Sequence, residues 1–141
     1  MKYLMTNLSL VMFVLLSLVA PCAAISPVDA NEAVEALMQH QSQSSPVPLH
    51  ALGNLVAKAY DNPADSLRLE QAMITFLKSD ATAYAKQCIC KELVKIGSAA
   101  CVPVLADLLL DPSVAESACY ALRSNTSEQA AEALRSALSK A

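Results

Sequence analysis

The chain has 141 residues, enough for one domain, and its formal net charge is -3. A nucleic-acid-binding module normally shows a basic excess, so this balance argues against nucleic acid as a partner. Apolar residues make up 55% of the chain, but aromatics only 4% and glycines only 2 positions, and the abundance of Ala and Leu favours helices over sheets.

Residues 1–24 have the pattern of a secretory signal peptide. Lys2 provides the positive start, Leu8–Ala20 is apolar apart from two serines, and small residues occupy the positions that signal peptidase inspects. We therefore expect cleavage after Ala24 and an exported protein, periplasmic or secreted, with no membrane association afterwards. An uncleaved N-terminal anchor and a lipid on Cys22 are the alternatives, and Pro21 before that cysteine disfavours the lipid.

Residues 25–48 should form an N-terminal helix and a linker. Asp29 can cap a helix that runs to about His40, and the Ser- and Pro-rich segment Gln41–Pro48 then breaks the helical pattern. This first helix is expected either to be loosely attached or to cover the open end of the later helices. The histidines His40 and His50 flank the linker and are expected to be solvated rather than metal ligands.

Helical patterns continue in pairs from Leu49 to the end of the chain, separated by short polar breaks. The expected helices are Leu49–Tyr60, Leu67–Ser79, Ala81–Ile96, Ala99–Leu110, Pro112–Ser124 and Ala130–Leu138. Expected helix starts are Asn62 with Pro63, Asp80, Ser98, Asp111 with Pro112, and Thr126, and Gly97 is expected to end a helix.

The last two pairs repeat one another at a shift of 29 residues. The shift matches Cys90 with Cys119, Leu93 with Leu122, Ser98 with Ser127, Leu105 with Leu134, and Leu109 with Leu138. A more divergent copy precedes them. Helical hairpins in tandem are typical of an α-solenoid. We therefore expect an all-α fold, a short α-α superhelix of about three antiparallel helix pairs over residues 49–141.

The segment 85–112 resembles a bacterial HEAT repeat. The resemblance lies in the turn Ile96-Gly97, the start Val102-Pro103 of the second helix, and the closing leucines before Asp111-Pro112. It extends over residues 65–139, although the final copy replaces Ile-Gly by Asn125-Thr126. The resemblance implies a curved stack that binds other proteins, and implies no single activity. Some members of that family handle bilin chromophores as lyases.

Four cysteines come after the signal peptide: Cys88, Cys90, Cys101 and Cys119. Cys88 and Cys90 lie two apart on a helix, so their side chains diverge. Cys90 and Cys119 occupy equivalent places on helices whose axes lie about 8–10 Å apart, too far for a favourable bridge. We expect buried, reduced thiols; one disulfide, or a metal or redox site, is the alternative.

A polar stripe on one expected helix is the candidate partner-binding surface. Gln87, Lys91 and Lys95 are spaced at i, i+4 and i+8, and exposed tyrosines Tyr84 and Tyr120 are expected nearby. The stripe suits an acidic protein partner, and the alternative is an ordinary solvated face.

No nucleophile elbow or phosphate-binding loop is present in the sequence. The expected function is therefore an exported HEAT-repeat scaffold for protein–protein interaction, not an enzyme and without a cofactor. The alternative is a thiol-redox or cofactor-handling protein of the bilin-lyase-like kind. The chain ends directly after a repeat with no polar closing helix, which indicates a longer parent chain, a homo-oligomer or a fragment.

Overall fold

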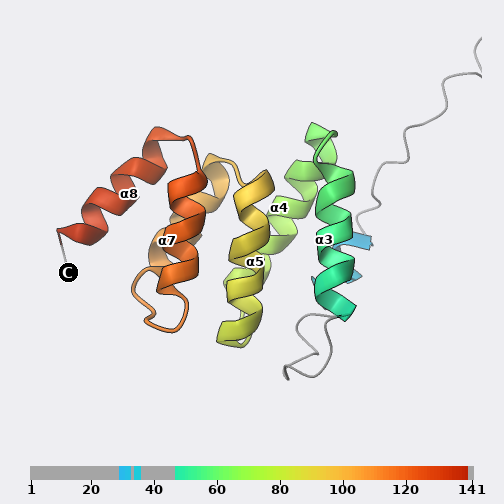
Figure 1. Ribbon diagram of the computed structural model, residues 1–141, viewed down its shortest axis with the longest axis horizontal. Coiled ribbons are helices and arrows are strands. Elements are labelled where there is room, and N and C mark those ends of the chain that lie inside the picture. The colour runs from blue at the N-terminus through green and yellow to red at the C-terminus, as the bar shows by residue number, and fades with distance from the viewer. Residues whose placement is uncertain (1–28, 33, 36–46, 140–141) are drawn as a thin grey trace, which may run out of the picture.

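The computed structural model describes residues 29–32, 34–35 and 47–139, and throughout these ranges the chain is all-α. The helices are α3 (Val47–Ala59), α4 (Pro63–Leu77), α5 (Ala83–Ile96), the 3-10 turn η1 (Ala99–Cys101), α6 (Val102–Leu108), α7 (Ala115–Ser124) and α8 (Glu128–Leu138) (Figure 1). Residues 29–32 and 34–35 are also helical. The expected signal peptide, most of the linker and His40 lie outside the described residues.

Each helix packs mainly on its neighbours along the chain. Helices α3, α5 and α7 lie side by side in one row, and α4 lies behind α3 and α5 (Figure 1). In the later part of the chain, α6 contacts both α7 and α8. One continuous set of buried apolar side chains runs from Ala30 and Val34, through α3, to Ala130 in α8. The apolar core therefore extends along the row of helices.

The expected start of α4 and the expected end of α5 are confirmed. The side chain of Asn62 accepts a hydrogen bond from the amide of Ala64 at 3.1 Å, and Pro63 takes the first position of α4, where its missing N–H costs nothing. Gly97 ends α5, and its amide donates to the carbonyl of Leu93 at 2.7 Å. Asn62-Pro63 starts a helix and Gly97 ends one through contacts within a single helical turn. The sequence alone therefore predicts both boundaries.

Three expected helix starts are wrong. The cap of α5 is Thr82, whose hydroxyl accepts from Ala85, and not Asp80. Ser127 caps α8 instead of Thr126. Helix α7 begins at Ala115, since the Asp111 carboxylate is occupied by the amide and hydroxyl of Ser113 in a separate turn. For α5 and α8 two capping residues stand close together in sequence and one of them is used, whereas α7 begins after Val114 without a side-chain cap.

Ser98 caps the next element as expected, but that element opens with η1 before α6 begins at Val102. The Ser98 hydroxyl accepts from the amide of Ala100 at 3.1 Å. Pro103, near the start of α6, lacks an amide hydrogen, and an early place in the helix makes this loss harmless. The expected single helix Ala99–Leu110 is thus a 3-10 turn followed by a short α-helix.

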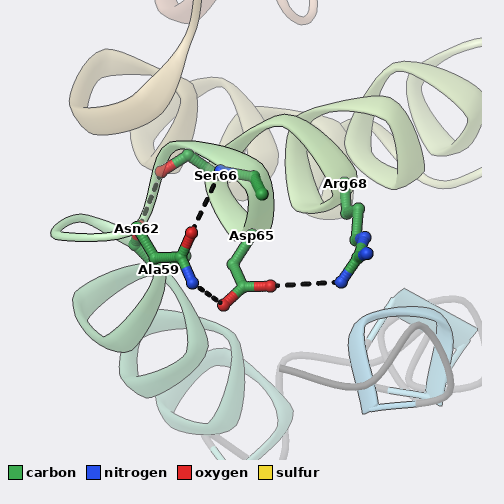
Figure 2. Close-up of polar contacts among 6 residues, drawn as sticks. Ala59, Asn62, Asp65, Ser66 and Arg68 are labelled. Carbon is green, nitrogen blue, oxygen red and sulfur yellow. Dashed lines mark hydrogen bonds and ion pairs between the residues drawn. The ribbon is translucent and has the colours of Figure 1, made fainter. Parts of the chain in front are cut away.

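A buried carboxylate fixes the turn between α3 and α4 (Figure 2). Asp65 is 3% exposed and accepts a hydrogen bond from the Asn62 side-chain amide at 2.7 Å. Its other oxygen lies 3.4 Å from the Arg68 guanidinium. The Ser66 hydroxyl donates across the turn to the carbonyl of Ala59 at 2.7 Å. Buried polar groups need such partners. The bonds of Asp65 therefore stabilise the first turn of α4, and the bond from Ser66 to Ala59 joins that turn to the end of α3.

A second buried carboxylate links α4 to the turn between α5 and η1. Glu70 is 1% exposed and accepts from the Ser98 amide at 2.7 Å and from the Ser98 hydroxyl at 2.9 Å. The side-chain amide of Asn125, after α7, donates to the carbonyl of Ser98 at 2.7 Å. Three polar residues from successive parts of the chain thus meet at one turn. The turn is held from both sides by charge-assisted and neutral hydrogen bonds.

Candidate partner-binding groove

A groove of about 620 Å³ lies between α5 and α7 and brings together three of the five candidate residues. Gln87 and Lys91 line it from α5, and Tyr120 lines it from α7. The side chains that complete its lining are Pro112, Ser113, Glu116, Ser117, Cys119 and Arg123. The groove exists because α5 and α7 are packed side by side.

Tyr84 and Lys95 do not line this groove. Tyr84, in the first turn of α5, is 47% exposed. Lys95, in the last turn of α5, forms an ion pair of 2.7 Å with Glu92 of the same helix. An exposed pair of this kind contributes little to stability, but it occupies the ammonium group. Of the residues on α5 in the candidate surface, Gln87 and Lys91 are therefore the two that line the groove.

The base of the groove is tied by one hydrogen bond between distant parts of the chain. The Gln87 side-chain amide donates to the backbone carbonyl of Ser113 at 2.7 Å. Ser113 is itself held by Asp111, whose carboxylate accepts from the Ser113 amide at 2.9 Å and hydroxyl at 2.6 Å. These bonds to Ser113 lower the pKa of Asp111 below its ordinary value. The loop before α7 is thereby positioned against α5.

The groove carries two cations with no ion-pair partner among the described residues, Lys91 and Arg123. Both side chains are exposed, and Glu116 is the acidic residue in the same lining. Tyr120 lies on α7 three residues before Arg123 and is 57% exposed. An aromatic ring beside available cations is a common arrangement at protein interfaces, where Tyr and Arg are enriched.

Arg123 is the functional candidate that the sequence analysis missed. It lies three residues after Tyr120, so helical spacing already places both on one side of α7. At the 29-residue shift its counterpart in α5 is Val94, an apolar residue. The repeat pattern therefore predicts an apolar residue at position 123. The charged residue found there departs from the pattern, and that departure indicates a role at the surface.

The thiols are mostly buried and none of the four is bonded to another. Cys88, Cys90 and Cys101 are buried and Cys119 is half-buried. Burial raises the pKa of Cys90 to about 11. Burial, together with the nearby Glu70 carboxylate, raises the pKa of Cys101 to about 12. At pH 8 a thiol with a pKa of about 12 is ionised in roughly one molecule in 10,000, so its chemistry as a nucleophile is suppressed.

Cys88 shows the same effect in weaker form. Burial raises its pKa, and a hydrogen bond with Tyr84 and the charge of Lys91 offset only part of that rise.

Over the described ranges, no three metal-ligating side chains come together, and His50 is exposed. A helix both long and apolar enough to cross a membrane does not occur in the part of the chain that the structure covers.

Comparison with protein-family models found no match for this chain, and comparisons with curated proteins and with solved structures found none either.

Proposed function

We propose that this protein is an exported, short α-solenoid of the HEAT type that binds an acidic segment of another protein in the groove between α5 and α7. One observation carries the proposal: exposed Tyr120 and two cations, Lys91 and Arg123, line the same groove from two different helices. Neither cation has an ion-pair partner within the described ranges. Such cations beside an aromatic ring favour carboxylates presented by a partner chain.

The tandem character of the helices supports the solenoid part of the proposal. Ser98 and Ser127, equivalent at the 29-residue shift, both cap the next element along the chain. Glu70 and Asn125 reach the turn at Ser98 from 28 and 27 residues away. Contacts at this spacing, repeated along the chain, are expected where each unit packs on the next. The resemblance of residues 85–112 to HEAT repeats favours a binding surface over a catalytic pocket.

The exported part of the proposal rests on the sequence. The apolar segment Leu8–Ala20 predicts delivery of the protein outside the cytoplasm. The form recovered from its own cells should then begin at Ile25. In an oxidising compartment, buried thiols with raised pKa values resist oxidation, so their presence is compatible with export.

Affinity capture with matched charge variants tests the groove. The exported form is immobilised and exposed to the envelope fraction of its own cells, and retained proteins are identified by mass spectrometry. The test variant is Lys91→Glu with Arg123→Glu. The control is Lys58→Glu with Arg135→Glu, which makes the same change of net charge on exposed residues of α3 and α8.

We expect the wild type and the control to retain the same partner, and the groove variant to lose it. Retention should also weaken as salt rises, because exposed charges are screened. Equal retention by the groove variant would remove the groove from the proposal. Failure of the wild type to retain any protein specifically would contradict the scaffold function itself.

A further inference from the structure

The groove between α5 and α7 has two chemically different ends, because the two helices that form it run in the same direction. Near the start of both helices, the Gln87 side chain of α5 donates to the carbonyl of Ser113, which precedes α7. Near their ends, Asn125, which follows α7, donates to the carbonyl of Ser98, which follows α5. Figure 1 shows the two helices side by side. Equivalent ends of α5 and α7 therefore lie together.

Hydrogen-bond acceptors and negative charge lie at the start of the groove. Glu116, in the first turn of α7, is exposed and lines it. The Gln87 amide nitrogen is bonded to Ser113, whereas its side-chain oxygen accepts no hydrogen bond from the described residues. Asp111 lies in the loop at the same end, and Lys86 is the cation close enough to affect its pKa. Of these three charged groups, two are acidic, so this end is acidic.

Positive charge lies at the other end of the groove. Arg123, in the last turn of α7, comes seven residues after Glu116, which is about 10 Å along the helix axis. Lys91 comes one turn after Gln87 on α5, so acceptor and cation follow in the same order on both helices. Neither cation is ion-paired with Glu116 in the part of the chain that the structure describes. The acidic and basic groups of the groove are therefore both available to a partner.

The helix dipole explains only part of this arrangement. An acidic residue in the first turn of α7 and a basic residue in its last turn both suit the ends of a helix. The dipole effect fades within one turn of each end, and Lys91 lies in the middle of α5. The repetition of the same order on α5 therefore needs another reason.

We propose that the groove takes a partner segment of mixed charge in one orientation, with carboxylates at Lys91 and Arg123 and a Lys or Arg side chain at Glu116. This inference rests on the proposed function, because it adds a basic residue to the acidic segment that the groove binds. An extended segment advances about 3.3 Å per residue, so the basic residue should follow or precede the nearest carboxylate by about three residues. The opposite placement would bring like charges together at both ends, which costs affinity.

Three synthetic peptides with blocked ends test the charge order. The first, Asp-Asp-Ala-Ala-Lys, has the expected spacing. The second, Asp-Asp-Lys-Ala-Ala, has the same composition and net charge, but its basic residue is next to the carboxylates. The third, Asp-Asp-Ala-Ala-Gln, is acidic only. Each is titrated into the ¹⁵N-labelled exported form, and the backbone amide shifts of α5 and α7 give the dissociation constant in the millimolar range, where short peptides bind.

Two single variants locate the effect on the protein. Glu116→Gln removes the carboxylate at the start of the groove, and the matched control is Glu128→Gln, which makes the same change of charge on exposed α8. The double variant Lys91→Glu with Arg123→Glu removes the cations. Both glutamates are exposed, so neither single change disturbs the core, and the comparison among peptides on the wild type needs no variant at all.

We expect the wild type and Glu128→Gln to bind the first peptide about 2- to 5-fold more tightly than the second, as for one exposed ion pair. Glu116→Gln should bind these two peptides equally. Equal binding of the two by the wild type, or a preference that persists in Glu116→Gln, would overturn the inference.

The acidic peptide separates this inference from the proposed function. If the wild type binds Asp-Asp-Ala-Ala-Gln and the double variant does not, but the first two peptides bind the wild type alike, the groove still takes acidic segments and the mixed-charge inference alone is wrong. If none of the three peptides shifts the amides of α5 and α7, the inference and binding of acidic segments in the groove are both contradicted.

Discussion

The inner copy of the repeat, α5 to α6, and the outer copy, α7 to α8, share a pattern but differ in burial. Cys90 is 0% exposed and its counterpart Cys119 is half-buried; Leu105 is 0% exposed and Leu134 is half-buried. Even so, Leu93 and Leu122 are buried alike, at 3% and 1% exposed. Two of these three matched pairs therefore differ in burial although their residue types are the same, so residue type alone does not decide whether a position is interior.

The largest expected effect comes from truncating the matched leucines. Leu105→Ala should lower the free energy of unfolding by about 2–5 kcal/mol, because it opens a cavity in a fully enclosed site. Leu134→Ala should cost about 1 kcal/mol or less, since solvent already reaches that site. Urea unfolding of both variants measures the difference. Equal losses would show that the outer copy is as well packed as the inner one.

The matched turn positions Gly97 and Thr126 should show a smaller contrast. A Cβ atom on Gly97 would lie 2.5 Å from the carbonyl oxygen of Leu93 and 3.0 Å from the sulfur of Cys101. Gly97→Ala should therefore cost about 1–3 kcal/mol, as overpacking does in tight sites. Thr126 is exposed, and Thr126→Ala should stay within about 0.5 kcal/mol of the wild type. The same urea measurement applies, and a neutral Gly97→Ala variant would contradict the tight turn.

The smallest effect is a difference in rate between the matched thiols. Under native conditions at pH 8, a thiol reagent should modify Cys119 first, and Cys88, Cys90 and Cys101 only slowly, because these three are buried and their pKa values are raised. Mass spectrometry of partly labelled protein gives the order. A Cys119→Ser variant, which should react slowly throughout, is the control. Early labelling of Cys90 would contradict its enclosure.

The same pKa shifts give a pH dependence with a definite sign. Folding raises the pKa of Cys90 from 9.0 to about 11 and that of Cys101 to about 12, so the folded state favours the protonated thiols. Their contribution to stability is complete below about pH 9 and is lost as the pH rises from there through the folded-state values. The urea midpoint should fall over this range, and it should fall less in a Cys101→Ala variant.

Much of the fold can be predicted from sequence because its signals are local. The spacing of apolar residues, Asn62-Pro63 at a helix start and Gly97 at a helix end depend on neighbours within one turn. The exact starts of α5 and α8 cannot be predicted in this way, because competing caps such as Asp80 and Thr82 stand close together. The start of α7 is hidden for another reason: Asp111 bonds to Ser113 in a separate turn, and the helix begins after Val114 without a side-chain cap. Boundaries are therefore less predictable than helices.

The groove is only partly predictable for a related reason. Helical spacing puts Gln87 and Lys91 on one face of α5, but which side of α7 faces them depends on how the two helices pack. That packing places Arg123 in the groove, whereas Lys95 pairs with Glu92 outside it. The buried role of Glu70 is equally hidden in the sequence, because its partner Ser98 lies 28 residues away.

The Glu70 carboxylate also couples the folding of α4 to that of the turn at Ser98. If α4 were buried against its neighbours before this turn formed, the Glu70 carboxylate would be buried without the hydrogen bonds from Ser98. Such burial has a high energetic cost. The segments around α4 and α5 are therefore expected to gain structure in a single cooperative step, whereas α8 can detach and rejoin without disturbing that charge.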